Sequence, residues 1–488
     1  MANSAQRVLG AALVATAVLL CSACNARLGP GYRIERQEIE LSYVAADAPR
    51  LHVRATYRLR NDGDRDLSEI SAQLPDTATF GRENLRAAAD GREISLPPGA
   101  PPDGQGMRIP FAAPWPQRQR RALVLEYDLV PAAPGNAAAA VNPGSFHVRE
   151  EAAFPRLHRP EGPLGRGGEP PAEIQLVVRA PREFRVYAGG REERPRQRGG
   201  QIEHRFRLKQ RNLHLFAVGG TYQEQRNAAG DAAVIFWTFQ PLPVERAQAA
   251  AARLAATRRA LQDAFGPPGS SLPPEHLMET PARITHRWEG AGDPAGVAVP
   301  AGALLNRQVF LLDVASETFL DLVEHEMAHH WFGQFVAPEP EVEASLGEGL
   351  AEYAALVAAE ARGGEAERKH RAALLLRWYD ESRQKAADKP LLRLRVTDPY
   401  EQRVFGYNKG ALLFVTLEDE YGKEKVRRAL AHVAGARRGA HFGYADVLAA
   451  LEQEIGQDLG EFFRSWLNQA GIPQAVRARY EEKIEATK

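Results

Sequence analysis

The segment His325-Glu326-Met327-Ala328-His329 limits the possible folds of this chain more than any other, because its spacing has a chemical meaning only on a helix. Histidines four positions apart lie on one helix face, about one turn from each other, so their imidazoles can converge on one metal ion. Glu348 follows after residues 330–347 and can add a carboxylate, which completes a ligand set that catalytic zinc sites use. Glu326 can take a proton from a zinc-bound water.

The sequence around these residues predicts two helices. Ser316 and Thr318 are candidate N-caps for the first helix, and no proline follows before Pro338. The second helix is expected to begin near Ser345. The expected apolar positions of the two helices are Phe319, Leu322, Val323, Met327, Leu346, Leu350, Tyr353, Ala354 and Val357.

The same residues also have simpler interpretations. His325 and His329 could be surface histidines, and Glu348 could close a Ser-x-x-Glu capping box that starts at Ser345. Glu352 lies one helical turn after Glu348, where it could orient a ligand histidine or remain a solvated acid. The helical context favours a metal site over a pair of surface histidines.

The N-terminus resembles a secretory signal of the lipoprotein type, which we assign to residues 1–23. Arg7 precedes an uncharged, mostly apolar stretch, Val8–Leu20, which is short for a membrane span. Cys21 and Cys24 follow it, and we expect Cys24 to carry lipid in a bacterial envelope. Cleavage that releases a soluble exported protein is the alternative. The 62 basic and 62 acidic residues balance, so nothing indicates a nucleic-acid partner.

The hydrophobic pattern divides the rest of the chain into two domains. Period-two alternation, clearest from Leu51 to Leu59, predicts a β-sandwich-like domain over residues 32–225. Residues 230–473 read mostly as helices, with a buried strand expected at Val309–Leu312. A charged tail is expected at residues 474–488.

Several segments resemble the aminopeptidase N family of gluzincin zinc peptidases, which includes leukotriene hydrolase. The resemblance is strong from His325 onward and looser over the β-rich half. The segments are HEMAHHWFGQFV (His325–Val336), LGEGLAEY (Leu346–Tyr353), FGYNKGALLF (Phe405–Phe414), FFRSW (Phe462–Trp466) and GIP (Gly471–Pro473).

This resemblance implies a multidomain fold, with the β-domain followed by a thermolysin-like α+β domain that is mostly helical. It implies that His325, His329 and Glu348 hold one Zn²⁺ per chain and that Glu326 is the general base. It also implies that Tyr407 donates a hydrogen bond to the oxyanion of the reaction, with Tyr400 as the weaker alternative. The substrate would be a peptide or protein.

Two departures from the family pattern change the expected specificity. The family's Gly-x-Met-Glu-Asn motif, whose Glu holds a free amino terminus, is replaced by Ala295–Pro300, with Ala298 at the position of that Glu. The nearest acids, Asp293 and Glu289, lie outside the motif. The chain also ends soon after Pro473, where many relatives continue with a helical domain, so we expect a more open cleft.

We therefore predict a zinc-dependent peptidase with non-standard specificity, which could include endopeptidase activity. A binding or scaffold lipoprotein on a peptidase fold is one alternative. A hydrolase of a non-peptide substrate is another, as one branch of the family acts on an epoxide.

Overall fold

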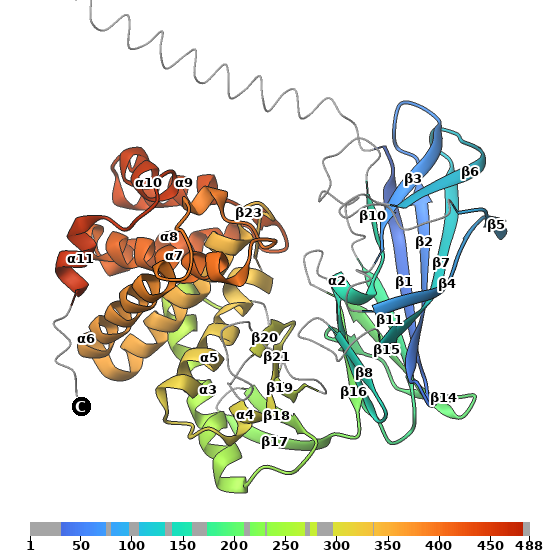
Figure 1. Ribbon diagram of the computed structural model, residues 1–488, viewed down its shortest axis with the longest axis horizontal. Coiled ribbons are helices and arrows are strands. Elements are labelled where there is room, and N and C mark those ends of the chain that lie inside the picture. The colour runs from blue at the N-terminus through green and yellow to red at the C-terminus, as the bar shows by residue number, and fades with distance from the viewer. Residues whose placement is uncertain are drawn as a thin grey trace, which may run out of the picture.

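Two domains make up the part of the chain that the structure, a computed structural model, describes (Figure 1). The N-terminal domain consists mainly of strands, and helices dominate the second domain. Among the described helices, none combines the length and the apolar character needed to cross a membrane. The described residues are 31–74, 80–96, 107–131, 139–158, 173–208, 215–229, 232–268, 274–280, 296–334 and 336–481, so the expected leader lies outside them.

The N-terminal domain contains three β-sheets. The largest has the order β13-β15-β11-β1-β2-β7-β4-β5, with β14 paired to β15, and the smaller sheets are β10-β3-β6 and β12-β16-β9-β8. The elements are β1 (Arg33–Val44), β2 (Arg50–Arg60), β3 (Leu67–Gln73), β4 (Phe80–Ala89), β5 (Arg92–Ile94), β6 (Met107–Trp115), β7 (Arg120–Pro131), β8 (Ala139–Asn142), β9 (Ser145–Arg149), α2 (Glu150–Ala153), β10 (Arg156–His158), β11 (Ile174–Ala180), β12 (Arg185–Tyr187), β13 (Arg191–Glu192), β14 (Arg196–Arg198), β15 (Gln201–Leu208) and β16 (Phe216–Gly220).

Alternating side chains of β2 build the core of this domain. Val53 and Ala55 are fully buried, and they pair with Leu41 and Ile39 of the antiparallel neighbour β1. Successive strand residues point to opposite faces, so one face of the sheet supplies the apolar layer and the other carries arginines and acids. The sheet-rich domain followed by a helical domain confirms the predicted fold class.

The second domain packs its helices around a five-stranded sheet with the order β17-β18-β19-β21-β20. Strands β18, β19 and β21 are parallel, whereas β17 and β20 are antiparallel edges. The elements are β17 (Gln223–Ala229), β18 (Ala232–Thr238), α3 (Val244–Phe265), β19 (Glu275–Glu279), β20 (Gly296–Val299), β21 (Gly302–Leu305), α4 (Arg307–Leu311), α5 (Glu317–Ala328), β22 (Ala337–Pro338), α6 (Glu348–Arg383), α7 (Tyr400–Tyr421), α8 (Lys423–Ala436), β23 (His441–Phe442), α9 (Tyr444–Ile455), α10 (Gly460–Leu467) and α11 (Gln474–Tyr480).

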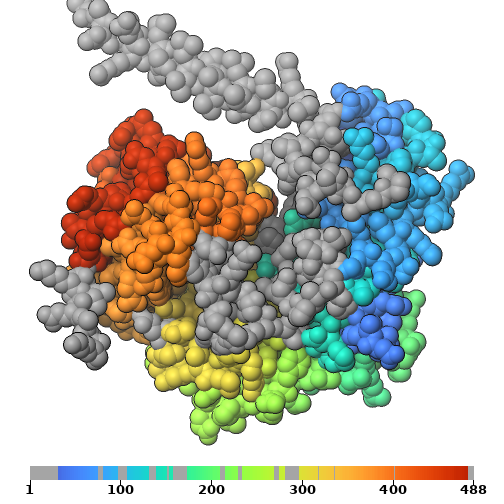
Figure 2. All heavy atoms as spheres, in the orientation of Figure 1, coloured from blue at the N-terminus to red at the C-terminus, as the bar shows by residue number. Residues whose placement is uncertain are grey.

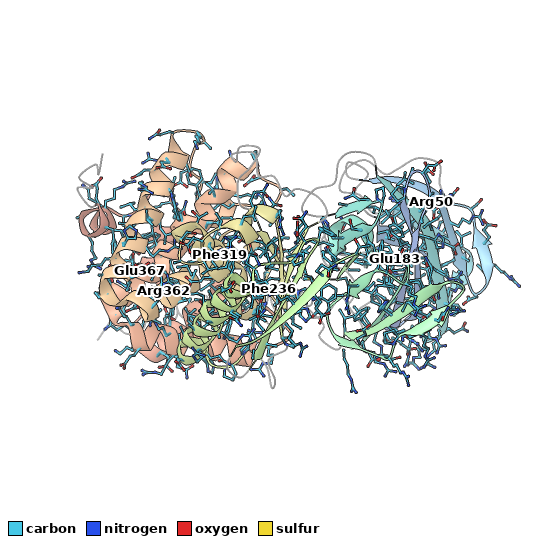
Figure 3. The ribbon with its side chains drawn as sticks, turned by 90° about the horizontal axis from the view of Figure 1, so that it is seen from below. Arg50, Glu183, Phe236, Phe319, Arg362 and Glu367 are labelled. Carbon is cyan, nitrogen blue, oxygen red and sulfur yellow. The ribbon has the colours of Figure 1, made fainter. Side chains whose placement is uncertain are left out.

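Phe236 of β18 and Phe319 of α5 lie in the core between this sheet and the helices, and Figure 3 shows both within the second domain. A separate apolar cluster joins the two domains. There, Phe216 of β16 packs with Trp237 of β18 and Val299 of β20. Tyr187 of β12 stacks on His276 of β19, with ring centroids 4.0 Å apart. The two domains therefore meet beside the edge strand β20.

The structure corrects two expectations. Val309–Leu312 is not a strand, because β21 already occupies the sheet position beside β19 and the next residues form helix α4. Four apolar residues fit either element, so periodicity could not separate them. The sheet of the second domain begins with β17 at Gln223, so this domain starts before the expected domain boundary at residue 225. Within α6, Gly364 has a non-helical conformation (φ 71°), so two helical segments meet there in a kink.

The expected charged tail at residues 474–488 begins with a helix. Residues Gln474–Tyr480 form α11, because Val476 and Tyr480 lie four apart on one face and both are buried. The Tyr480 hydroxyl donates to Asp419 Oδ2 at 2.6 Å, which fixes this helix to α7. Residues 482–488 lie outside the described part of the chain.

Glycines allow α7 to approach the start of α6 unusually closely. A Cβ on Gly410 would lie 2.6 Å from the Ser345 carbonyl oxygen and 2.9 Å from Gly349 Cα. A Cβ on Gly406 would lie 1.7 Å from the Ala344 carbonyl oxygen. Only a residue without a side chain fits at such backbone contacts. This packing brings α7 against the turn that precedes Glu348.

Gly410→Ala should therefore destabilise the protein by about 1–3 kcal/mol, because the added methyl group overpacks a backbone contact. Gly435→Ala in α8 is the matched control, since its Cβ would meet nothing within 4 Å. That change should be neutral or stabilising by up to about 1 kcal/mol through helix propensity. Thermal unfolding of both variants checks this, and an unchanged Tm for Gly410→Ala would contradict the packing argument.

Candidate metal centre

Helix α5 carries both histidines near its C-terminal end. The helix begins after Ser316, whose hydroxyl oxygen accepts a hydrogen bond from the Phe319 amide at 3.3 Å, so the predicted N-cap is confirmed. His325 is buried, and His329, at the end of the helix, keeps 15% of its side chain exposed. The spacing places both rings on the face that points toward α6.

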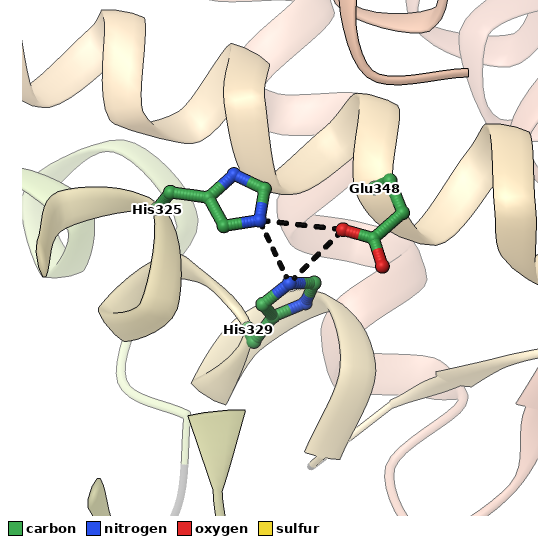
Figure 4. A group of neighbouring side chains, drawn as sticks. All are labelled: His325, His329 and Glu348. Carbon is green, nitrogen blue, oxygen red and sulfur yellow. Dashed lines mark hydrogen bonds and ion pairs between the residues drawn. The ribbon is translucent and has the colours of Figure 1, made fainter. Parts of the chain in front are cut away.

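The three expected ligands come together at one point (Figure 4). Glu348 Oε2 lies 3.3 Å from the Nε2 atom of each histidine, and the two Nε2 atoms lie 3.1 Å apart. Ligand atoms about 2.0–2.2 Å from a tetrahedral zinc ion stand about 3.3–3.6 Å from one another. The spacing of the three atoms therefore fits one zinc ion, with the partly exposed side of the site left for water.

The proton positions of the histidines support the same conclusion. His329 Nδ1 lies 3.2 Å from the Phe332 carbonyl oxygen, which can only accept, so Nδ1 carries the proton. His325 Nδ1 faces the Glu352 carboxylate at 3.3 Å. With the proton on Nδ1, a neutral histidine presents its Nε2 lone pair to the point that it shares with Glu348, where a cation can bind.

Gly333 shapes the position of His329. It has φ 153°, a conformation that favours glycine, and a Cβ there would lie 2.9 Å from His329 Nδ1. The chain turns sharply at this point after α5, and the turn lets the Phe332 carbonyl reach back to the His329 ring. Because Gly333 has no side chain, it leaves room for the ring of His329, an expected metal ligand.

A buried chain of charges supports His325 from behind. Glu352 Oε1 lies 3.3 Å from His325 Nδ1, and Arg371 Nη2 lies 3.8 Å from the other Glu352 oxygen. Arg371, which is 2% exposed, also pairs with Asp321 of α5. Of the two interpretations of Glu352, the structure thus places it beside the ligand histidine. Arg371 was not singled out in the sequence, because its contacts join α6 to residues far away in the chain.

Tyr407 lies beside the metal centre. Its ring stacks on His325, with centroids 5.5 Å apart and an interplanar angle of 18°. The close contact of α7 with the start of α6 places it there. The Tyr407 side chain is half-buried. The side chain of Tyr400 lies outside the described residues.

Glu326 lies between the metal ligands and the edge strand β20. A Cβ on Gly296 would come within 3.4 Å of Glu326 Oε1, so the strand passes directly beside this carboxylate. The described residues of β20, Gly296–Val299, include no acid, and Ala298 pairs with Ala303 of β21. Asp293 and Glu289 lie outside the described residues. The resemblance implied that this segment lies at the substrate's amino terminus, and the structure places β20 beside Glu326.

Burial and neighbouring charges shift the pKa values of Glu326 and Glu348 in opposite directions. Burial raises the pKa of Glu326, and the nearby histidines only partly offset this. Burial also opposes ionisation of Glu348, but His329 and His325 together outweigh it and hold the pKa of Glu348 well below its usual range. Glu348 therefore stays a carboxylate ligand, whereas Glu326 is the group more ready to take a proton.

His330 is not part of the ligand group. Its Nε2 lies 3.6 Å from Glu275 Oε1 in the core, and Arg258 Nη2 donates to the other Glu275 oxygen at 3.0 Å. His330 therefore packs in the core beside a buried ion pair.

Comparison with known proteins points to one family. Residues 301–466 match the model of the peptidase family M1 domain. A probable aminopeptidase 1 from Saccharolobus solfataricus is 26% identical over 41% of this chain and 26% of its own length. Aminopeptidase M1-B from Oryza sativa is 26% identical over 31% of this chain and 18% of its own length. The matched part of this chain thus spans about a quarter or less of these relatives.

Solved structures show the shared fold. The M1 zinc metallopeptidase from Deinococcus radiodurans aligns with a TM-score of 0.64 and 19% identity, over 94% of this chain and 98% of that one. A mutant of that protein bound to a Tyr-Ser-Ala substrate aligns with a TM-score of 0.63 and 18% identity, over 91% and 96% of the chains. The two-domain fold is shared with these zinc metallopeptidases, and the His-His-Glu group is a zinc-ligand set of the gluzincin type. The match of residues 301–466 to the M1 domain and the aminopeptidase relatives support the aminopeptidase N-like family that the sequence resembles.

Glu352→Gln should weaken zinc binding by about 10–100-fold, because the amide cannot hold the Nδ1 proton of His325 as a carboxylate does. Glu381→Gln, also on α6 but with 55% of its side chain exposed, is the control and should bind zinc like the wild type. Competition with a chromogenic chelator measures both affinities. Equal affinity of the two variants would mean that Glu352 does not support the ligand.

Proposed function

We propose that this protein is a zinc-dependent peptidase that hydrolyses peptide bonds with a metal-activated water. The observation that carries the proposal is the convergence of His325, His329 and Glu348 with Glu326 beside them. A purely structural zinc site is closed by four protein ligands. This site offers three ligands and adjoins a buried carboxylate, an arrangement suited to activating water.

Each residue has a distinct part in the reaction. A bound zinc ion would lower the pKa of its water toward about 7 and polarise the scissile carbonyl. Glu326 takes the proton of the attacking water and returns it to the leaving amine. The Tyr407 hydroxyl donates to the oxygen that becomes negatively charged. Glu352 keeps His325 in the tautomer that presents Nε2 to the metal.

Glu326→Gln should reduce peptide hydrolysis by at least about 100-fold, because the amide cannot accept the proton. The three ligands are untouched, so zinc content should stay at one ion per chain. Initial rates on a quenched-fluorescence peptide, together with metal analysis, check both statements. A variant with full activity would refute the mechanism, and a wild type that binds zinc but cleaves no peptide would favour a binding protein.

Tyr407→Phe should lower kcat by about 10²–10³-fold with little change in zinc affinity, the usual size of losing one oxyanion donor. Phenylalanine keeps the ring that stacks on His325, so the variant removes only the hydroxyl. Steady-state kinetics and zinc titration test this. If kcat and zinc affinity fall together, Tyr407 instead supports the ligand.

We propose that the specificity differs from that of a standard aminopeptidase. No acidic side chain lies on the described part of β20, so this strand offers no counter-charge for a free amino terminus beside Glu326. A peptide library with free and acetylated amino termini should therefore be cleaved at comparable rates. A strong preference for free termini would show that another group holds the amine.

Export to a bacterial envelope is proposed from the leader-like residues 1–23 alone. Lipidation of Cys24 would hold the mature chain at the membrane by its acyl groups. Cys24→Ser should then move the protein from the membrane fraction to the soluble fraction after export. An unchanged distribution would point to ordinary cleavage.

A further inference from the structure

Lys409 is a buried cation two positions after Tyr407 on α7. Its side chain has no exposed surface, and its Nζ lies 3.3 Å from Asp388 Oδ2. Nζ also donates to the carbonyl oxygens of Gln469 at 2.8 Å and Lys389 at 3.4 Å, so each of its three N–H groups has an acceptor. Gln469 belongs to the C-terminal part of the chain, which Figure 2 shows in red, directly against the orange part that includes α7. Because a buried charge is costly unless it is paired, these bonds hold the ammonium group at one place in the core.

Asp388 collects hydrogen bonds from three segments. The Tyr379 hydroxyl of α6 donates to Asp388 Oδ2 at 2.8 Å, and the Gly471 amide donates to the same oxygen. The Tyr379 ring also packs edge-on against Phe405 of α7, with ring centroids 5.6 Å apart. The pair of Lys409 and Asp388 therefore joins the first turns of α7 to α6 and to the segment between α10 and α11.

Tyr407 and Lys409 leave α7 on opposite sides, because residues two positions apart on a helix point about 200° from each other. The Tyr407 ring lies on His325. The glycine contacts of Gly406 and Gly410 set how closely α7 approaches the turn before α6. Glycines have no side chains that interlock, so these contacts do not stop α7 from turning about its axis. The directional bonds of Lys409 fix that rotation.

We propose that Lys409, held by Asp388, is a positioning residue for the Tyr407 hydroxyl. By fixing the rotation of α7, the buried pair aims the phenol at the oxygen that becomes negatively charged in the reaction. An oxyanion donor acts only when it lies within hydrogen-bond distance of that oxygen, and a misplacement of about 1 Å can cost about 100-fold in rate. This inference rests on the proposed role of Tyr407 in peptide hydrolysis and gives that role a structural cause.

Removal of the pair tests the inference. Lys409→Met combined with Asp388→Asn takes away both charges, so neither is left buried without its partner. This double variant should lower kcat by about 10–100-fold with KM changed less than about threefold, because the hydroxyl acts on charge that develops in the transition state. Zinc affinity should stay at the wild-type value, since the three ligands are untouched. Steady-state kinetics on a quenched-fluorescence peptide, zinc titration and circular dichroism measure these quantities.

Arg428→Met is the matched control for loss of an ion pair. Arg428 Nε lies 3.1 Å from Glu454 Oε2 and joins α8 to α9, and the arginine side chain is 59% exposed. This variant should keep the wild-type kcat, because the pair makes no contact with α7.

The same double variant in a Tyr407→Phe background separates positioning from a general loss of structure. Without a hydroxyl to aim, loss of the pair should lower kcat by less than about a further twofold, so the two effects should not add. Equal losses of kcat with and without the Tyr407 hydroxyl would overturn the inference, because they would mean that the pair only supports the fold. An unchanged kcat in a folded, zinc-loaded double variant would also overturn it.

Asp388→Asn alone protects the test against a folding defect, since the amide oxygen can still accept from Tyr379 and Gly471 while its bond to Lys409 is weakened. It should lower kcat in the same way, and only when the Tyr407 hydroxyl is present. If Tyr407→Phe lowers kcat but neither pair variant does, the positioning role is wrong and the peptidase proposal stands. A wild type that cleaves no peptide would refute the peptidase proposal and this inference with it.

Discussion

The metal centre depends on one constraint. The ligand atoms of His325, His329 and Glu348 must be held closer together than they would lie without a cation. Two imidazole nitrogens 3.1 Å apart repel when both carry lone pairs, so the surrounding fold must supply the energy that keeps them in place. That energy comes from packing on two sides. Arg371 ties α6 to Asp321 on the histidine helix, and the glycine contact fixes α7 against the turn before Glu348. Protein interiors transmit such constraints because they are densely packed.

Local sequence signals predicted the parts of the site that one helix can encode. The His-Glu-x-x-His spacing and the Ser316 cap depend on neighbours within one or two turns, and both are found as expected. The position of Glu348 followed from the resemblance of a second segment. The period-two pattern of β2 predicted its buried face, because alternation is fixed by strand geometry.

Long-range contacts could not be predicted in the same way. Arg371 looks like any arginine in a helical segment, and its role comes from residues on α5. Val309–Leu312 fits a strand or a helix, and the competing strand β21 decided the outcome. These features depend on which elements meet, which a single sequence does not state.

Gly333 shows that metal affinity is encoded partly in backbone shape. Its left-handed conformation and the absence of a side chain decide where the His329 ring can lie. A related chain could therefore retain both histidines and the glutamate and still have lost its metal through a single methyl group. Counting ligand residues in an alignment would score such a chain as an intact enzyme, so the residue at this turn should be read together with the ligands.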